Sequence, residues 1–133
     1  MKVISLEQAQ KEFQKWADAK RLSEKVIEKH IDDKEAMVDA IMNGNLILNE
    51  DNTLKQILEF PVKDGQVKEL VYKFRITEGE LAASTRGIRT DDLIGQFSLC
   101  YVAALTGQDR GTIRVLDSVD VSLGKHIAAF FSV

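Results

Sequence analysis

Residues 53–76 read TLKQILEFPVKDGQVKELVYKFRI, and this stretch decides the fold that the sequence predicts. Apolar and polar side chains alternate from Val67 to Ile76, which is the period of a β-strand with one buried face. The turn Lys63-Asp64-Gly65 precedes this strand, and Thr53 to Phe60 has the extended character of a neighbouring strand. The stretch therefore predicts an antiparallel pair of strands that packs one face on helices and leaves the other in water.

A third strand and a single proline complete the predicted sheet. The apolar run at 45–48 and the polar turn at 49–52 predict a short strand before the pair, and so a β-meander at about residues 45–76. Pro61 is the only proline of the chain. We expect it at the end of a strand, where a missing N–H group is tolerated.

Before the meander, apolar side chains recur at the three- and four-residue spacing of helices. Ser5 and Gln8 form the Ser-x-x-Gln pattern of a capping box, which predicts a helix at about 6–20. A second helical pattern runs from about residue 22 to Gly44, either as one helix or as two helices separated at Asp32-Asp33. The apolar stripe of the first helix is Leu6, Ala9, Phe13, Trp16 and Ala17.

After the meander the helical period returns. Thr77 caps a predicted short turn, and Thr90 caps a helix at about 91–105 that Gly107 ends. Ser118 opens a last helix. The apolar stripe of the helix at 91–105 is Leu93, Phe97, Cys100, Tyr101, Ala104 and Leu105, and that of the last helix is Val119, Leu123, Ile127, Phe130 and Phe131.

The predicted architecture is α+β in a single domain, residues 1–133. A helical amino-terminal element covers 1–44, the antiparallel β-meander covers 45–76, and a carboxy-terminal helical bundle covers 77–133.

Composition narrows the classes of function. The 18 basic and 21 acidic side chains give a net charge of −3, which removes the broad attraction to phosphate that nucleic-acid binding uses. No apolar run reaches the ~20 residues that cross a bilayer. The lone Cys100 cannot close an intrachain disulfide. We therefore expect a cytoplasmic protein that binds neither membrane nor nucleic acid.

Residues that carry catalytic chemistry are few. His30 and His126 lie far from other ligands at metal-binding spacing, so we expect both to be structural, and Cys100 is most simply a small apolar side chain. The glycines form no phosphate-binding motif. The sequence thus predicts no enzyme, no catalytic residue, no metal and no cofactor.

One predicted loop is a candidate binding site. Arg86, Ile88 and Arg89 lie together there, and arginine with aliphatic side chains is favoured at interfaces with acidic partners or phosphate. A solvated loop is the simpler interpretation.

A series of short motifs covers about three-fifths of the chain, from about Leu54 to Phe131. The motifs are Phe60-Pro61 before Lys-Asp-Gly, the strand Leu70–Ile76 leading into Glu78-Gly-Glu-Leu81, then Leu105-Thr-Gly107, Leu116-Asp-Ser-Val-Asp120 and the closing Phe130-Phe131. In order and spacing they resemble the tail assembly chaperones of Mu-like and related tailed bacteriophages. The first ~45 residues have no counterpart in that family, and they are a candidate dimerisation or client-binding element.

The resemblance implies a noncatalytic protein of the bacterial host cytoplasm. Such chaperones bind the long helical tape measure protein, keep it soluble and help to recruit tail-tube subunits, and members often also occur in a longer, frameshifted form. The candidate partner-binding residues are Leu6, Phe13, Trp16, Arg86, Ile88, Arg89, Phe130 and Phe131. Core packing is the simpler role for each apolar member taken singly.

Three alternatives stay open. The first is a structural phage or prophage protein, such as a head-tail connector or a tube-associated component, and the second is a small protein–protein adaptor domain. The third, a nucleic-acid-binding regulator, rests on the helix-turn-helix-like pattern at Thr112 to Phe131, and the net acidity argues against it.

Overall fold

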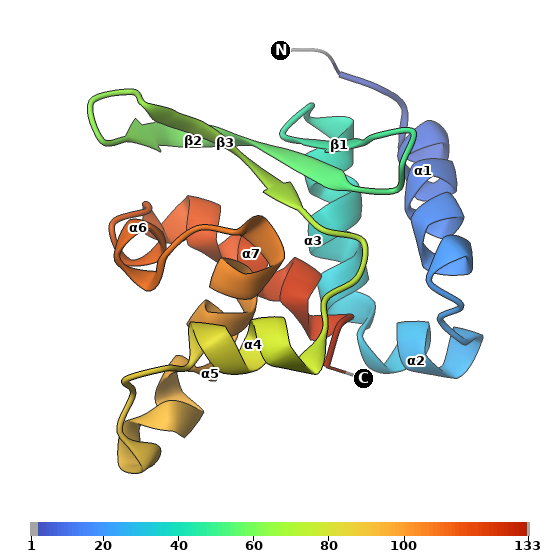
Figure 1. Cartoon of the computed structure of the whole chain (residues 1–133). Coiled ribbons are helices and arrows are strands. Elements are labelled where there is room, and N and C mark those ends of the chain that lie inside the picture. Colours follow the sequence, from blue (N-terminus) through green and yellow to red (C-terminus); the bar gives the residue numbers. More distant parts are fainter. Residues whose placement is uncertain (1–2, 133) are drawn as a thin grey trace.

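The computed structural model describes residues 3–132, without the side chain of Ile94. Helices precede and follow a three-stranded antiparallel sheet, so the α+β prediction is confirmed (Figure 1). The elements in chain order are α1 (Leu6–Ala19), α2 (Glu24–Lys29), α3 (Ile31–Met42), β1 (Leu46–Leu48), β2 (Leu54–Val62), β3 (Val67–Tyr72), α4 (Glu78–Ser84), α5 (Thr90–Thr106), α6 (Arg110–Arg114) and α7 (Ser118–Ala129).

The sheet has the order β1-β2-β3, which is the predicted meander. β3 ends at Tyr72, earlier than the predicted Ile76, because the N–H of Lys73 donates to the carbonyl of Leu105 in α5 at 2.8 Å. β2 continues past the predicted Phe60 to Val62. Its register with β3 is irregular between Ile57 and Val62, so Pro61 lies inside the strand at a place where the ladder is already interrupted.

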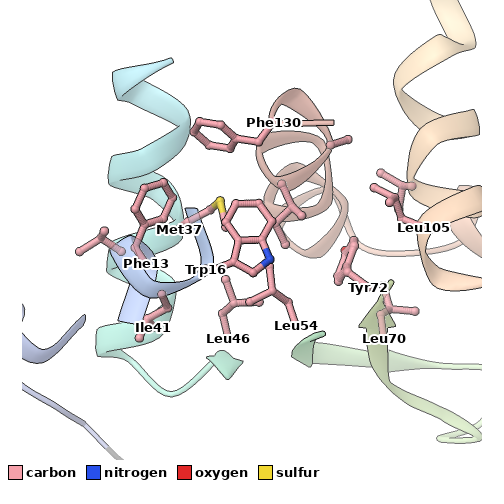
Figure 2. Close-up of a cluster of buried hydrophobic side chains, with 14 of the residues drawn as sticks. Phe13, Trp16, Met37, Ile41, Leu46, Leu54, Leu70, Tyr72, Leu105 and Phe130 are labelled. Atoms are coloured by element: carbon pink, nitrogen blue, oxygen red, sulfur yellow. The ribbon is translucent and has the colours of Figure 1, made fainter. Parts of the chain in front are cut away.

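One face of the sheet is covered by helices, with α3 and α7 beneath it in Figure 1. Leu54, Leu70 and Tyr72 point toward these helices and are buried, whereas the intervening Val71 is exposed. Figure 2 shows that the buried side chains of the sheet meet Trp16 from α1 and Met37 from α3. The core therefore joins the amino-terminal helices, the sheet and the carboxy-terminal helices.

The helix starts are set by local hydrogen bonds. The hydroxyl of Ser5 accepts from the N–H of Gln8 at 3.1 Å, which confirms the predicted cap of α1. The reciprocal half of the capping box is absent, since the Gln8 side chain donates to Glu12 instead. Thr77 and Glu80 form a complete capping box at α4.

The second helical pattern is two helices, and it divides at His30 instead of at the predicted Asp32-Asp33. His30 has φ −111° and ψ 38°, outside the helical region. The two aspartates lie in the first turn of α3, where their charge meets the positive end of the helix. Sequence spacing alone missed this break because no glycine or proline marks it.

The ends of α3 and α5 follow the prediction, because Gly44 and Gly107 adopt left-handed φ values of 80° and 69°. The start of α5 differs: Thr90 is its first residue, and no side chain caps it. The predicted apolar stripes are also wrong at three places, because Leu6, Phe97 and Val119 are exposed. The early turns of α5 extend away from the body in Figure 1, and α7 turns Asp120 inward in place of Val119.

Candidate binding site

A groove lies between α1 and β1 and encloses about 530 Å³. Its lining is mainly apolar and comes from the segment before α1, from α3 and from β1. Gln8 and Glu12 supply a polar wall from α1. The apolar lining residues are Ile4, Ile41, Leu46, Ile47 and Leu48.

The groove borders the outer edge of the sheet, because among residues 3–132 β1 pairs only with β2. The backbone of Asn45 accepts from Ile57 at 2.7 Å, and the N–H of Asn49 donates to Thr53 at 2.9 Å. Hydrogen-bonded pairs alternate along an antiparallel ladder, so the N–H and C=O groups of Leu46 and Leu48 point away from β2. The groove therefore combines apolar side chains with backbone groups of an edge strand, which is suited to binding an apolar segment of another chain.

Leu6, at the start of α1, is 51% exposed, but it is not among the residues that line this groove.

Phe13, Trp16 and Phe130 do not form a binding surface, and their prediction as partner contacts is wrong for the folded chain. Each is about 1% exposed. The ring of Phe130 lies 5.6 Å from that of Phe13 and 6.0 Å from that of Trp16, centroid to centroid. The three rings pack edge-on between α1 and the end of α7, so they hold the two ends of the chain together.

Phe131 is half-buried and packs against Lys20. The Nζ of Lys20 lies 3.6 Å from the centre of the Phe131 ring and donates to the carbonyl of Phe74 at 2.8 Å. Burial lowers the pKa of Lys20 to about 8, and the nearby charge of Arg75 contributes. Phe131 thus belongs to a cation–π contact that joins the end of α1 to the chain after α7.

The predicted loop residues lie elsewhere. Arg86 and Arg89 are exposed and Ile88 is half-buried, in the segment between α4 and α5. In Figure 1 this segment lies on the opposite side of the molecule from β1, whose residues line the groove. The eight predicted residues therefore do not form one site.

A buried acid that sequence spacing missed is Asp120 in α7, which is 2% exposed. Its carboxylate accepts from the backbone N–H groups of Glu59 at 2.9 Å and Phe60 at 3.1 Å. Its carbonyl accepts from Gln56 Nε2 at 2.9 Å, and Gln56 Oε1 accepts from the hydroxyl of Tyr72 at 2.6 Å. Burial raises the pKa of Tyr72, and the charge of Asp120 adds to this effect. This network attaches α7 to the sheet.

The two histidines, which the sequence separates widely, share one carboxylate. Asp33 Oδ1 is 2.7 Å from Nδ1 of His126, and Oδ2 is 3.0 Å from Nδ1 of His30. Because a carboxylate only accepts hydrogen bonds, each Nδ1 carries a proton. Within residues 3–132, no group of three His, Cys, Asp or Glu side chains is placed to hold a metal ion. The contact joins α3 to α7, and no local pattern predicts it, since Asp33 and His126 are 93 residues apart.

No protein-family model matches the chain, and neither a curated protein nor a solved structure matches it. Among the described residues, no helix combines the length and the apolar character that a membrane span requires.

Proposed function

We propose that this protein is a noncatalytic tail assembly chaperone that binds a phage tape measure protein in the bacterial cytoplasm and assists assembly of the tail tube. The order of motifs from Leu54 to Phe131 supports this proposal. The observation that carries it is the groove between α1 and β1, whose apolar lining lies beside β1, the edge strand of the sheet that the described residues form.

The groove suits an amphipathic client helix. Ile4, Ile47 and Leu48 offer accessible apolar side chains to the buried face of such a helix, while Gln8 and Glu12 lie where its polar flank would emerge. A shallow, partly polar groove favours reversible binding, which a chaperone needs because it releases its client as the tube forms.

Coexpression with a phage tape measure protein tests the proposal. We expect the client to become soluble and to copurify with the wild-type chain. Ile47→Glu puts a charge on a groove residue that is 40% exposed, and it should abolish copurification while the variant itself stays folded.

The matched control is Val115→Glu, at a position that is 57% exposed and does not line the groove. It should retain the client. A client that stays insoluble and unbound with the wild-type chain in excess overturns the proposal. Recovery of this protein in stoichiometric amounts from purified phage particles would instead establish a structural component.

A further inference from the structure

A second hollow, of about 560 Å³, lies between α4, the end of α5 and the start of α6. Three alanines supply small apolar side chains to its lining: Ala83, Ala103 and Ala104. Lys73, Arg86 and Arg110 contribute three positive charges to the same hollow. This concentration of cations contrasts with the net charge of −3 of the whole chain.

The two carboxylates of the hollow are already engaged by its own backbone and side chains. Glu80 accepts from Lys73 Nζ at 2.6 Å and from the N–H of Thr77 at 3.3 Å. Asp109 accepts from the N–H of Thr112 at 2.7 Å and so caps α6. The charge of Lys73 is therefore matched inside the molecule.

The positive charges of Arg86 and Arg110 have no such carboxylate partner among residues 3–132, since neither side chain lies within ion-pair distance of a carboxylate. Arg110 Nη1 donates to the carbonyl of Ser84 at 2.9 Å, which fixes its guanidinium group across the end of α4. By contrast, Arg89 on the same loop lies 3.5 Å from Asp91 and does not line the hollow.

We propose that this hollow binds an acidic segment of a partner protein, with a glutamate or aspartate carboxylate at Arg86 and Arg110 and a small apolar neighbour over the three alanines. Guanidinium groups bind carboxylates through paired hydrogen bonds, and arginine is enriched where proteins meet. The apolar lining favours a peptide over nucleic acid, whose phosphates need an extended row of cations. The hollow is separate from the groove beside β1, so this proposal goes beyond the chaperone proposal. An experiment can contradict one of the two proposals without contradicting the other.

Titration of the full-length, isotope-labelled chain with synthetic hexapeptides, followed by NMR, tests this inference. The probe is a capped peptide of alternating alanine and glutamate, and its glutamine counterpart is the control for charge. We expect the glutamate peptide to shift the amide signals of the 107–111 segment and to bind at least tenfold more tightly than the glutamine peptide. Added salt should weaken the binding of the glutamate peptide, because the contact is an exposed ion pair.

Two variants with the same change in charge decide whether the contact is specific. Arg86→Gln should lower the affinity for the glutamate peptide about tenfold, which corresponds to about 1.4 kcal/mol of binding free energy. Arg89→Gln, three residues away, should leave its affinity within twofold. Both positions are exposed, so both variants should unfold at the denaturant concentration of the wild type.

Several results overturn the inference. Equal binding of the two peptides means that the hollow does not recognise a carboxylate, and equal losses from the two variants mean that only overall charge matters. No shift at millimolar peptide means that the hollow binds no such segment. Tighter binding of inorganic phosphate or of a single-stranded oligonucleotide assigns the hollow to a phosphate ligand instead.

Discussion

The carboxylate of Asp120 accepts a hydrogen bond from the backbone N–H of Glu59, 61 residues earlier in the chain, at 2.9 Å. The same carboxylate accepts from the next N–H, that of Phe60, at 3.1 Å. These two groups lie in the irregular part of β2, where the ladder to β3 is interrupted next to Pro61. A side chain of α7 thus supplies the hydrogen bonds that the sheet does not.

Replacement of Asp120 should strongly destabilise the fold. Asp120→Asn keeps the shape but turns an NH2 group toward one of the two backbone donors, so we expect a loss of about 2–4 kcal/mol in the free energy of unfolding. Urea unfolding followed by circular dichroism measures it. Asp39→Asn, on the exposed side of α3, is the control and should change stability by less than about 0.5 kcal/mol. A loss below about 1 kcal/mol for Asp120→Asn would contradict this account.

Two glycines in helices should respond oppositely to the same substitution. A Cβ atom at Gly124 in α7 would lie 2.7 Å from the hydroxyl of Tyr72 and 3.2 Å from both methyl groups of Val102. We expect Gly124→Ala to cost about 1–3 kcal/mol, because this packed core cannot move aside freely. At Gly95 in α5 nothing lies within 4 Å. Gly95→Ala should therefore stabilise the chain by about 0.5–1 kcal/mol, through helix propensity alone.

Thermal unfolding of the two alanine variants and the wild type, under one buffer condition, checks this pair. A melting temperature that rises for Gly124→Ala would show that α7 does not pack on Tyr72 as closely as described.

The contact between Asp33 and His126 should appear as a coupling energy. We expect the double-mutant cycle of Asp33→Asn and His126→Gln to give about 0.5–1.5 kcal/mol, because the pair is partly buried and hydrogen-bonded at 2.7 Å. Urea unfolding at neutral pH supplies the four free energies. Additive single effects, within about 0.3 kcal/mol, would mean that the two side chains do not interact in solution.

Lys20 should make stability depend on pH in the weakly alkaline range. Its pKa of about 8 in the folded chain lies below the ordinary lysine value of 10.5, so between these values the unfolded chain binds more protons and stability rises with pH. Below pH 8 the Lys20 amine is protonated in both the folded and the unfolded chain, so the stability gained at higher pH is absent. We expect the stability of the wild type relative to Lys20→Met to increase by about 1 kcal/mol from pH 7.5 to pH 9.5, a figure reduced for partial exposure.

Urea unfolding at several pH values measures this difference, and Lys125→Met controls for the loss of a positive charge. The measurements stay below pH 10 because Tyr72 has the opposite effect above that pH. Its pKa is raised in the folded chain, so the unfolded chain loses the tyrosine proton first and stability falls as the pH rises above the ordinary tyrosine value. A difference that is flat or falls with pH would contradict the burial of the Lys20 amine.

Local signals predicted most of the fold. The Ser5 cap, the Thr77 helix start and the left-handed Gly44 and Gly107 all depend on residues within a few positions, and all four are present. The position at which α2 and α3 divide, His30, was not predicted, because no glycine or proline marks the break.

The candidate sites were less predictable for a physical reason. An apolar stripe on a helix looks the same whether it faces the core or a partner, so Phe13 and Trp16 could not be distinguished from a binding surface by spacing. The groove depends on α1 lying beside β1, and the hollow depends on the fold bringing Arg86, after α4, and Arg110, in α6, into one lining. Both arise only when distant segments come together.

The contact of Trp16 with Phe130 also sets an order of events during synthesis. Trp16 is the only tryptophan of the chain, and it completes its packing against a ring that the ribosome adds 114 residues later. Until the end of α7 has left the exit tunnel, the side of the Trp16 ring that Phe130 covers therefore lacks this partner, even where α1 already packs on α3. Indole fluorescence from this single residue consequently reports whether the two ends of the chain have met.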